Sequence, residues 1–529
     1  MIKWRRPFRL LFVVVGLAIG ASLAPSLSSC SSVNGSGGIN HARTPVDDQS
    51  TQVHLDRFEA VYKKYASNDA SQVRNLSHFR DALLRVRYDY VRDVGESELV
   101  DTAIAGIEES EPKLEPGKVD PDVLIEAALD KMMTSLDPHS SYLNSNELKE
   151  MKVSNRGEFG GLGIEVTMDG DFVKVVSPIE GTPASKAGII SGDLISHLDG
   201  VAIKGKTLIQ AVRLMRGKPG ADIRLTINRA EVEPFDVTIT RAIINVRSVR
   251  WHLEGDIGYI RVVSFSEKVA PGIDAAMQQI KNQLGDKLAG IVLDLRNNPG
   301  GLLQQSLTLS DAFLEKGTIV SVRGRRPGSQ RVFKADAGDY ANGLPVVVLI
   351  NPGSASASEI VAGALQDHRR AIIMGQQSFG KGSVQTITPL PQEGALRLTT
   401  QLYYSPSGRA IQARGITPDI EIIPIPRKEQ AQNKDAQVTK KKTEAQTKAE
   451  NGEEGEAVKK KVVRRREADL PGALSAVGDD GEHPHPTLPA QSCKPVGEKE
   501  DRALGCALAL IHAGSSAEFL ASVGQSSAM

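Results

Sequence analysis

The chain has 529 residues, which is too long for one hydrophobic core and predicts two to four domains. Its 64 Lys and Arg residues balance its 64 Asp and Glu residues, so no overall charge argues for a nucleic acid partner. Three cysteines are too few for a disulfide framework, and ten histidines without a His-Glu-x-x-His motif argue against a zinc peptidase. We expect neither a metal nor another cofactor.

Residues 1–30 have the features of an export signal. A basic stretch without acids is followed by about fifteen apolar or small residues, fewer than the roughly twenty that span a membrane comfortably. The sequence before Cys30 resembles a lipobox, in which Cys30 would be lipidated; cleavage near residues 21–24 and an uncleaved anchor are the alternatives. We therefore expect a protein of the periplasm or cell envelope that is anchored to the membrane.

A Ser- and Gly-rich tether is predicted over residues 31–54, and an N-terminal helical region over 55–148. In the helical region the apolar residues Phe79, Leu83 and Val86 recur at helical spacing. His139, near the end of this region, is better explained as a histidine that caps a loop than as a catalytic one.

Residues 149–243 resemble a PDZ domain. The segment 159–166 resembles the loop whose converging backbone N–H groups bind a terminal carboxylate, followed by a strand whose edge can pair with a peptide. A simple glycine hairpin is the alternative, but residues 183–195 follow in PDZ order, and a helix over 207–215 would line the groove. The predicted peptide-binding residues are Gly161, Leu162, Gly163, Ile164, Leu208, Val212 and Met215.

Residues 244–426 alternate strands with helices, which predicts an α/β core with crossover connections. After a buried strand at 345–350, a turn with three serines precedes a helix, where a hydroxyl and backbone N–H groups can meet negative charge. Farther on, Lys381 lies between two glycines. A lysine acts as a general base only where burial lowers its pKa, and Gln385 could hold the amine by a hydrogen bond.

The segments 353–360 and 379–385 together resemble the signature of the carboxyl-terminal processing proteases, tail-specific serine peptidases with a Ser/Lys dyad. The resemblance covers about residues 55–425. It implies a multidomain α/β (α+β) protein: a crotonase-like or ClpP-like protease core with an inserted PDZ domain and an N-terminal helical region.

The resemblance also implies the roles of individual residues. Ser356 would be the nucleophile, Lys381 the base and Gln385 the residue that orients the lysine. The backbone N–H groups of Gly301 and Ala357 would bind the oxyanion, with an uncertainty of one residue at Gly301. Asp367 is a secondary acidic candidate, which solvation at the surface would explain equally well.

The chain departs from the family after the core. Residues 427–467 are rich in Lys, Glu, Gln and Arg without an aromatic residue, which predicts a disordered linker; a basic patch for an anionic envelope polymer is the alternative. In the C-terminal extension 468–529, Cys493 and Cys506 would pair in an oxidising compartment.

The sequence thus predicts an exported serine endopeptidase that captures exposed apolar C-termini in a PDZ groove and cleaves near them. Its expected partners are the tails of protein substrates, an adaptor protein and further copies of itself bound through the N-terminal helices. One alternative is a non-catalytic PDZ scaffold, which has no use for both Ser356 and Lys381. The other is a crotonase-like acyl-thioester enzyme, which would need acidic catalytic residues and a nucleotide pocket.

Overall fold

The computed structural model describes residues 48–110, 114–179, 181–206, 208–425, 466–478, 485–497 and 500–526. The predicted export signal with Cys30, the first part of the tether and the charged linker up to residue 465 lie outside these ranges. Of the helices within the ranges, none has both the length and the apolar character needed to cross a membrane.

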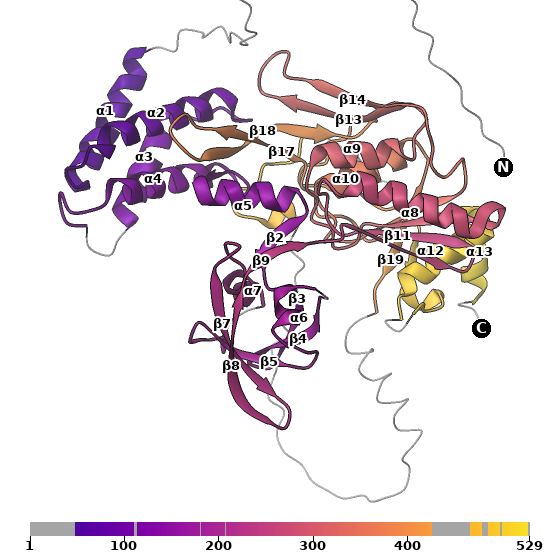
Figure 1. Ribbon diagram of the computed structural model, residues 1–529. Helices are drawn as coiled ribbons and strands as arrows, with labels where there is room; N and C mark the ends of the chain where they lie inside the picture. The colour runs from indigo at the N-terminus through magenta and orange to yellow at the C-terminus, as the bar shows by residue number, and fades with distance from the viewer. Residues whose placement is uncertain are drawn as a thin grey trace, which may run out of the picture. The chain divides into compact units, whose positions relative to one another are not determined.

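Four helices form the N-terminal region (Figure 1): α1 (Asp48–Tyr65), α2 (Ser71–Asp89), α3 (Glu96–Glu109) and α4 (Pro121–Leu136). Their apolar faces share one core, in which Phe58, Phe79 and Leu83 are almost fully buried. The helix α1 begins inside the predicted tether 31–54, so that prediction ends too late. The reason is that Thr51 already belongs to the packed helix, where its hydroxyl donates to the Glu96 carboxylate at 2.7 Å.

A short strand and a helix follow the four helices in the chain. The strand β1 (Ser141–Leu143) pairs antiparallel with β18 (Ala395–Tyr404), and α5 (Ser145–Asn155) follows it. The core of the helical region also includes Leu396 and Leu398 of β18. The helical region is therefore joined to the following domains both by a shared sheet and by a shared core.

The predicted PDZ domain lies between β2 (Glu158–Gly161) and β9 (Ala242–Asn245), which pair with each other where the chain enters and leaves the domain. Between them lie β3 (Ile164–Asp169), β4 (Phe172–Pro178), α6 (Pro183–Lys186), β5 (Leu194–Leu198), β6 (Val201–Ala202), α7 (Leu208–Met215), β7 (Asp222–Arg229) and β8 (Val232–Thr240). The strands form one sheet in the order β3-β4-β5-β7-β8, with β6 paired to β5. The inserted domain therefore has its own sheet and its own apolar core.

The α/β core is built on a seven-stranded sheet in the order β10-β11-β12-β15-β16-β19-β20. Its strands are β10 (Val249–Glu254), β11 (Ile257–Val262), β12 (Gly290–Asp294), β15 (Val346–Ile350), β16 (Ile372–Gly375), β19 (Ile420–Ile423) and β20 (Thr487–Pro489). All neighbours are parallel except β10 and β11. The helices α8 (Val269–Leu284), α10 (Ala357–Asp367) and α12 (Arg502–Ala513) pack against it, and α9 (Leu303–Asp311) packs on α8 and α10.

Both faces of this sheet are covered, which explains the uninterrupted apolar runs of its strands. In β15, Val346, Val348 and Ile350 belong to the core shared with α8 and α10. The alternate residues Val347 and Leu349 belong to a second core that includes α12. Because side chains alternate between the two faces of a strand, a strand in the middle layer must be apolar at every position.

A second sheet contains β1, β18, β13 (Gly317–Gly324) and β14 (Arg331–Ala335), with β17 (Ser383–Pro389) paired to β18. The predicted fold class, an α/β core with an inserted PDZ domain and an N-terminal helical region, is confirmed.

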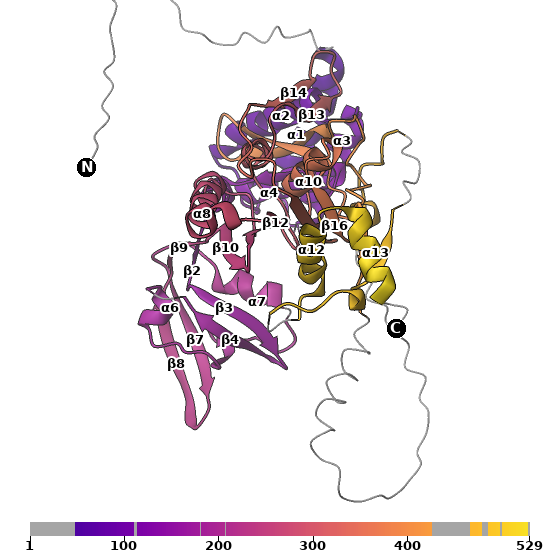
Figure 2. The ribbon, with the colours of Figure 1, turned by 90° about the vertical axis from the view of Figure 1, so that its right-hand side faces the viewer.

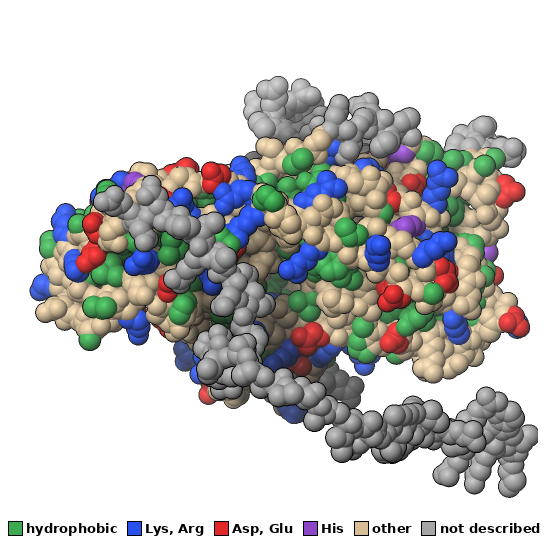
Figure 3. Space-filling model, turned by 90° about the horizontal axis from the view of Figure 1, so that it is seen from above, with side chains coloured by type: hydrophobic (Ala, Val, Ile, Leu, Met, Phe, Trp, Pro, Cys, Tyr) green, Lys and Arg blue, Asp and Glu red, His purple; other side chains and the backbone are tan. Residues whose placement is uncertain are grey.

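The C-terminal extension packs on the core sheet (Figure 2). The strand β20 extends the sheet beyond β19, and α12 is followed by α13 (Ser516–Ser526). A disulfide joins Cys493 to Cys506, as the sequence predicts for an oxidising compartment. On the face seen in Figure 3, acidic and basic side chains are interspersed, in keeping with the zero net charge.

Candidate active site

Ser356 lies in the turn between β15 and α10. Its φ of +54° is in the region that favours glycine, so the tertiary structure holds the backbone in a strained conformation here. The hydroxyls of the neighbouring Ser354 and Ser358 are buried and donate to backbone carbonyls, at 2.8 and 2.9 Å. Ser356 is the only partly exposed one of the three serines, and its hydroxyl donates to no other described residue. These contacts favour Ser356 as the nucleophile.

Lys381 lies in the turn between β16 and β17, and its side chain is partly buried. Burial is the main reason that the pKa of its amine lies below the usual value. The carboxylates of Glu467, Asp137 and Glu359 oppose this shift. The guanidinium of Arg397 adds to it.

Steric constraints explain why glycines stand on both sides of Lys381. A Cβ on Gly382 would lie 2.1 Å from the backbone nitrogen of Gln412, and Gly380 has a φ of +98°. Side chains at these positions would push the turn away from its neighbours. The Gly-Lys-Gly sequence is therefore required for the close packing that buries the lysine.

The carboxylate of Glu359 connects the two turns. Its Oε2 accepts hydrogen bonds from the backbone N–H of Ser356 at 2.7 Å and of Lys381 at 2.9 Å. Its Oε1 accepts from the Ser378 hydroxyl at 2.5 Å and from the Gly380 N–H at 2.6 Å. The side chain is fully buried, which raises the pKa of Glu359 to about 7, although the four donors pull the pKa down. Glu359 thus fixes the backbone of both candidate catalytic residues.

Sequence reasoning missed this role of Glu359. The signal was present, because Ser356 and Glu359 have the spacing of a capping box at the start of a helix. A capping acid is ordinarily solvated, however, and only the return of the chain through residues 378–381 buries this one.

The turn after β12 lies against the nucleophile turn. A Cβ on Gly300 would lie 2.8 Å from the Cβ of Ser356, and the N–H of Gly300 donates to the Asn298 side chain. Among the described residues, no backbone hydrogen bond between elements uses the N–H of Gly301 or of Ala357. The N–H of Gly300 is therefore not free to bind an oxyanion. The free N–H groups of Gly301 and Ala357 support their assignment to the oxyanion, which stays a prediction.

Two other predicted residues have different surroundings. The Gln385 side-chain amide donates to the hydroxyls of Ser383, at 2.9 Å, and Thr399, at 3.5 Å, and not to Lys381. Its orienting role stays a prediction. Asp367 is not solvated: it accepts from the Ser407 N–H and pairs with Arg409.

Burial disfavours the charge of Asp367, but hydrogen bonds from the turn at 405–407 outweigh it and lower the pKa of this carboxyl. The contacts of Asp367 join the end of α10 to a turn after β18, and none of them involves Ser356 or Lys381. They give Asp367 a structural role.

In the PDZ domain, Leu162 and Met215 are buried in the core, whereas Ile164, Leu208 and Val212 are partly buried at its edge. Gly163 has a φ of +78°, and a Cβ there would lie 2.3 Å from Thr182. The loop therefore needs its glycine, and the partly buried apolar residues are the ones accessible to a peptide. The assignment of the groove stays a prediction.

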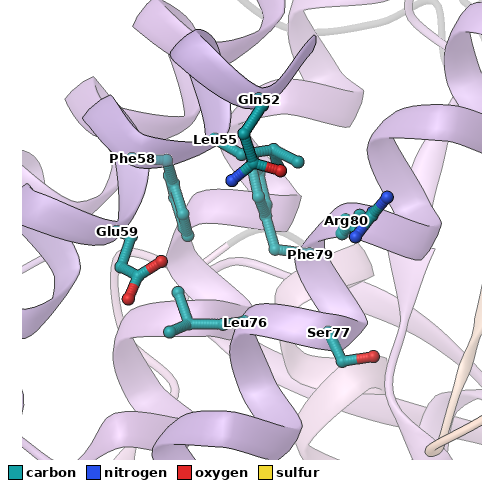
Figure 4. Close-up of a pocket in the computed structure, with 8 residues that line it drawn as sticks. All are labelled: Gln52, Leu55, Phe58, Glu59, Leu76, Ser77, Phe79 and Arg80. Carbon is teal, nitrogen blue, oxygen red and sulfur yellow. The ribbon is translucent and has the colours of Figure 1, made fainter. Parts of the chain in front are cut away.

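The remaining candidate features lie apart from the dyad. A cavity between α1 and α2 (Figure 4) is lined by Gln52, Leu55, Phe58, Glu59, Leu76, Ser77, Phe79 and Arg80 and holds none of the candidate catalytic residues. No group of three or more His, Cys, Asp or Glu residues that could hold a metal ion occurs in the part of the chain that the structure describes.

The chain matches two family models. Residues 256–422 match peptidase family S41, and residues 174–229 match the PDZ domain. The first match contains Ser356 and Lys381, and the second contains α7.

Related proteins match over more than half of this chain. A carboxy-terminal-processing protease of Bartonella bacilliformis is 52% identical over 365 residues, which cover 68% of this chain and 78% of the relative. A "Probable CtpA-like serine protease" of Staphylococcus aureus (strain COL) is 38% identical over 308 residues, 58% of this chain and 61% of the relative. Among solved structures, a photosystem II D1 C-terminal processing protease is 28% identical with a TM-score of 0.43, covering 67% of this chain and 93% of its own.

Proposed function

Because the chain belongs to peptidase family S41 and is a serine peptidase with a PDZ domain, we propose that it binds exposed apolar C-termini and cleaves near them with Ser356 and Lys381. The observation that carries the proposal is the shared carboxylate of Glu359, one oxygen of which accepts from the N–H of both residues. A scaffold would not need this arrangement.

The chemistry follows from the two side chains. The neutral amine of Lys381 accepts the proton of the Ser356 hydroxyl as Oγ attacks the scissile carbonyl carbon. The N–H groups of Gly301 and Ala357 stabilise the resulting oxyanion, and its collapse expels the new N-terminal amine, which takes the proton from Lys381. Water then attacks the ester with Lys381 again as base, which releases the peptide acid and restores Ser356.

The proposed preference for apolar tails is supported by the edge of the PDZ core. Ile164 on β3 and Leu208 and Val212 on α7 are apolar and only partly buried. A peptide added along β3 would place its last side chain against such residues, while the loop before β3 meets its carboxylate.

We place the protein outside the cytoplasm, in the periplasm or cell envelope. The disulfide between Cys493 and Cys506 supports an oxidising compartment. Membrane attachment, an adaptor and a homo-oligomer formed through the N-terminal helices are further parts of the proposal that rest on the sequence alone.

The test is cleavage of an unfolded protein with an apolar C-terminus by the full chain. Ser356→Ala and Lys381→Ala should each lower kcat/KM by at least about a thousandfold and leave tail binding intact. Ser154→Ala and Lys334→Ala, which change exposed residues outside the site, serve as matched controls. Cleavage should also fall when the last three residues of the substrate are aspartates.

The outcome also separates the alternatives. Retained cleavage in Ser356→Ala would disprove the nucleophile assignment. Tail binding without cleavage by the wild type would favour the PDZ scaffold, and hydrolysis of acyl thioesters in place of peptides would favour the crotonase-like enzyme.

A further inference from the structure

The segment 466–478 returns to the candidate active site after the predicted linker. Glu467 begins a 3₁₀ helix, Glu467–Asp469, and its side chain is 1% exposed. The sequence places this residue at the end of a disordered charged linker, and that boundary is wrong at Glu467. Burying a carboxylate is costly unless it is paired and hydrogen-bonded, so its partners indicate why it lies there.

The partners of Glu467 lie on both sides of Lys381. Its backbone N–H donates to the carbonyl of Phe379 at 3.1 Å, two residues before the lysine. Its Oε1 accepts from the Gln412 side-chain amide at 3.1 Å. The oxygen of the same amide accepts from the N–H of Gly382 at 3.0 Å, one residue after the lysine. The segment therefore holds the lysine turn at both ends.

Other contacts anchor the segment. The ring Nε2 of His139 lies 2.9 Å from both carboxylate oxygens of Glu467, and the His139 backbone is in turn held by Asp137. The carbonyl of Leu474 accepts from Gln412 at 3.2 Å, and the Leu474 side chain packs on β18 residues. Glu467 thus joins the N-terminal region, the lysine turn and the C-terminal extension at one buried point.

We propose that Glu467 is a positioning residue of the peptidase, through which the C-terminal segment 466–478 holds the turn that carries the Lys381 amine. This inference rests on the proposed role of Lys381 as the base. The charged groups that face Lys381 are Glu467, Arg397, Asp137 and Glu359, and the His139 ring lies against the Glu467 carboxylate. The charge of Glu467 favours the ammonium form, which raises the pKa of Lys381 and partly offsets the lowering by burial.

Two substitutions separate shape from charge. Glu467→Gln keeps the size of the side chain and removes its charge, so the pKa of Lys381 should fall further. Since the neutral amine is the active form, the acidic limb of the kcat/KM profile should move to lower pH. Glu467→Ala also removes the contact with Gln412, and kcat should fall by about ten- to a hundredfold with little change in KM.

Asp469→Asn is the matched control, because it makes the same chemical change on an exposed residue of the same 3₁₀ helix. Its pH profile and kcat should equal those of the wild type. An unmoved profile in Glu467→Gln together with an unchanged kcat in Glu467→Ala would overturn the inference. A higher kcat of Glu467→Ala than of the wild type, at a pH above the acidic limb of both profiles, would also overturn it, because the segment would then obstruct the site.

A second readout does not depend on proteolysis. Acylation of Lys381 by an amine-directed reagent, followed over pH by mass spectrometry of the full chain, reports the deprotonation of this amine directly. Its midpoint should be lower in Glu467→Gln than in the wild type and in Asp469→Asn. If the midpoint is lower in Glu467→Gln but neither the wild type nor any variant cleaves the substrate, the effect of Glu467 on Lys381 stands and the peptidase proposal is rejected. If the substrate is cleaved but the midpoint is the same in Glu467→Gln as in the wild type, only the inference about Glu467 is rejected.

Discussion

Replacing Glu359 by Gln should lower both the stability and the peptidase activity of the protein, although the two side chains have the same size. Each carboxylate oxygen accepts two hydrogen bonds from buried donors. An amide presents an NH₂ group in place of one oxygen. This group would face the two donors that the oxygen now accepts from, and it can accept from neither. A buried donor left without an acceptor costs about 1–3 kcal/mol, so the loss should be about 2–6 kcal/mol.

The assay is thermal unfolding of the full chain together with its peptidase activity. At about 2–4 °C per kcal/mol for domains of this size, the melting temperature of the protease core should fall by roughly 4–24 °C. Glu267→Gln, which changes an exposed carboxylate in the same domain, should leave both unchanged. A Glu359→Gln protein with wild-type melting temperature and activity would refute the claim that this carboxylate fixes both turns.

Two further predictions concern the packing of the site and of the extension. Gly300→Ala should lower kcat by about ten- to a hundredfold, because its Cβ would lie 2.8 Å from the Cβ of Ser356; Gly328→Ala, with a positive φ but open space, is the control, and equal kinetics of the two variants would contradict this account. Replacing both Cys493 and Cys506 by Ser should lower the free energy of unfolding, measured without reductant, by about 3 kcal/mol. The reason is that the bridge joins residues 13 positions apart, and closing a loop of about this length restricts the unfolded chain by that amount. Equal stability of the variant and the oxidised wild type would contradict it.

Local sequence patterns predicted the elements whose structure depends on neighbours along the chain. The run from Val346 to Ile350 was recognisable as a buried strand because both of its faces are covered, and the glycines beside Lys381 indicated close packing. In both cases the physical requirement is visible within a few residues.

Contacts between distant segments were not predictable in this way. Glu359 has the sequence of an ordinary helix cap, and Asp367 that of a solvated acid, until residues 378–381 and Arg409 are brought against them. Glu467 follows a stretch whose composition predicts disorder, and its partner His139 lies 328 residues earlier in the chain. No local pattern marks such a pair.

The position of β20 determines how much of the chain must be synthesised before the protein can finish folding. The seven-stranded sheet of the protease core includes residues 487–489, and its second core includes α12, close to the end of the sequence. The N-terminal region likewise needs β18, about 250 residues downstream, to cover its core. Such distant pairings form slowly. A chain in synthesis lacks these parts until β20 and α12 have been made, so the peptidase domain can be complete only after that point.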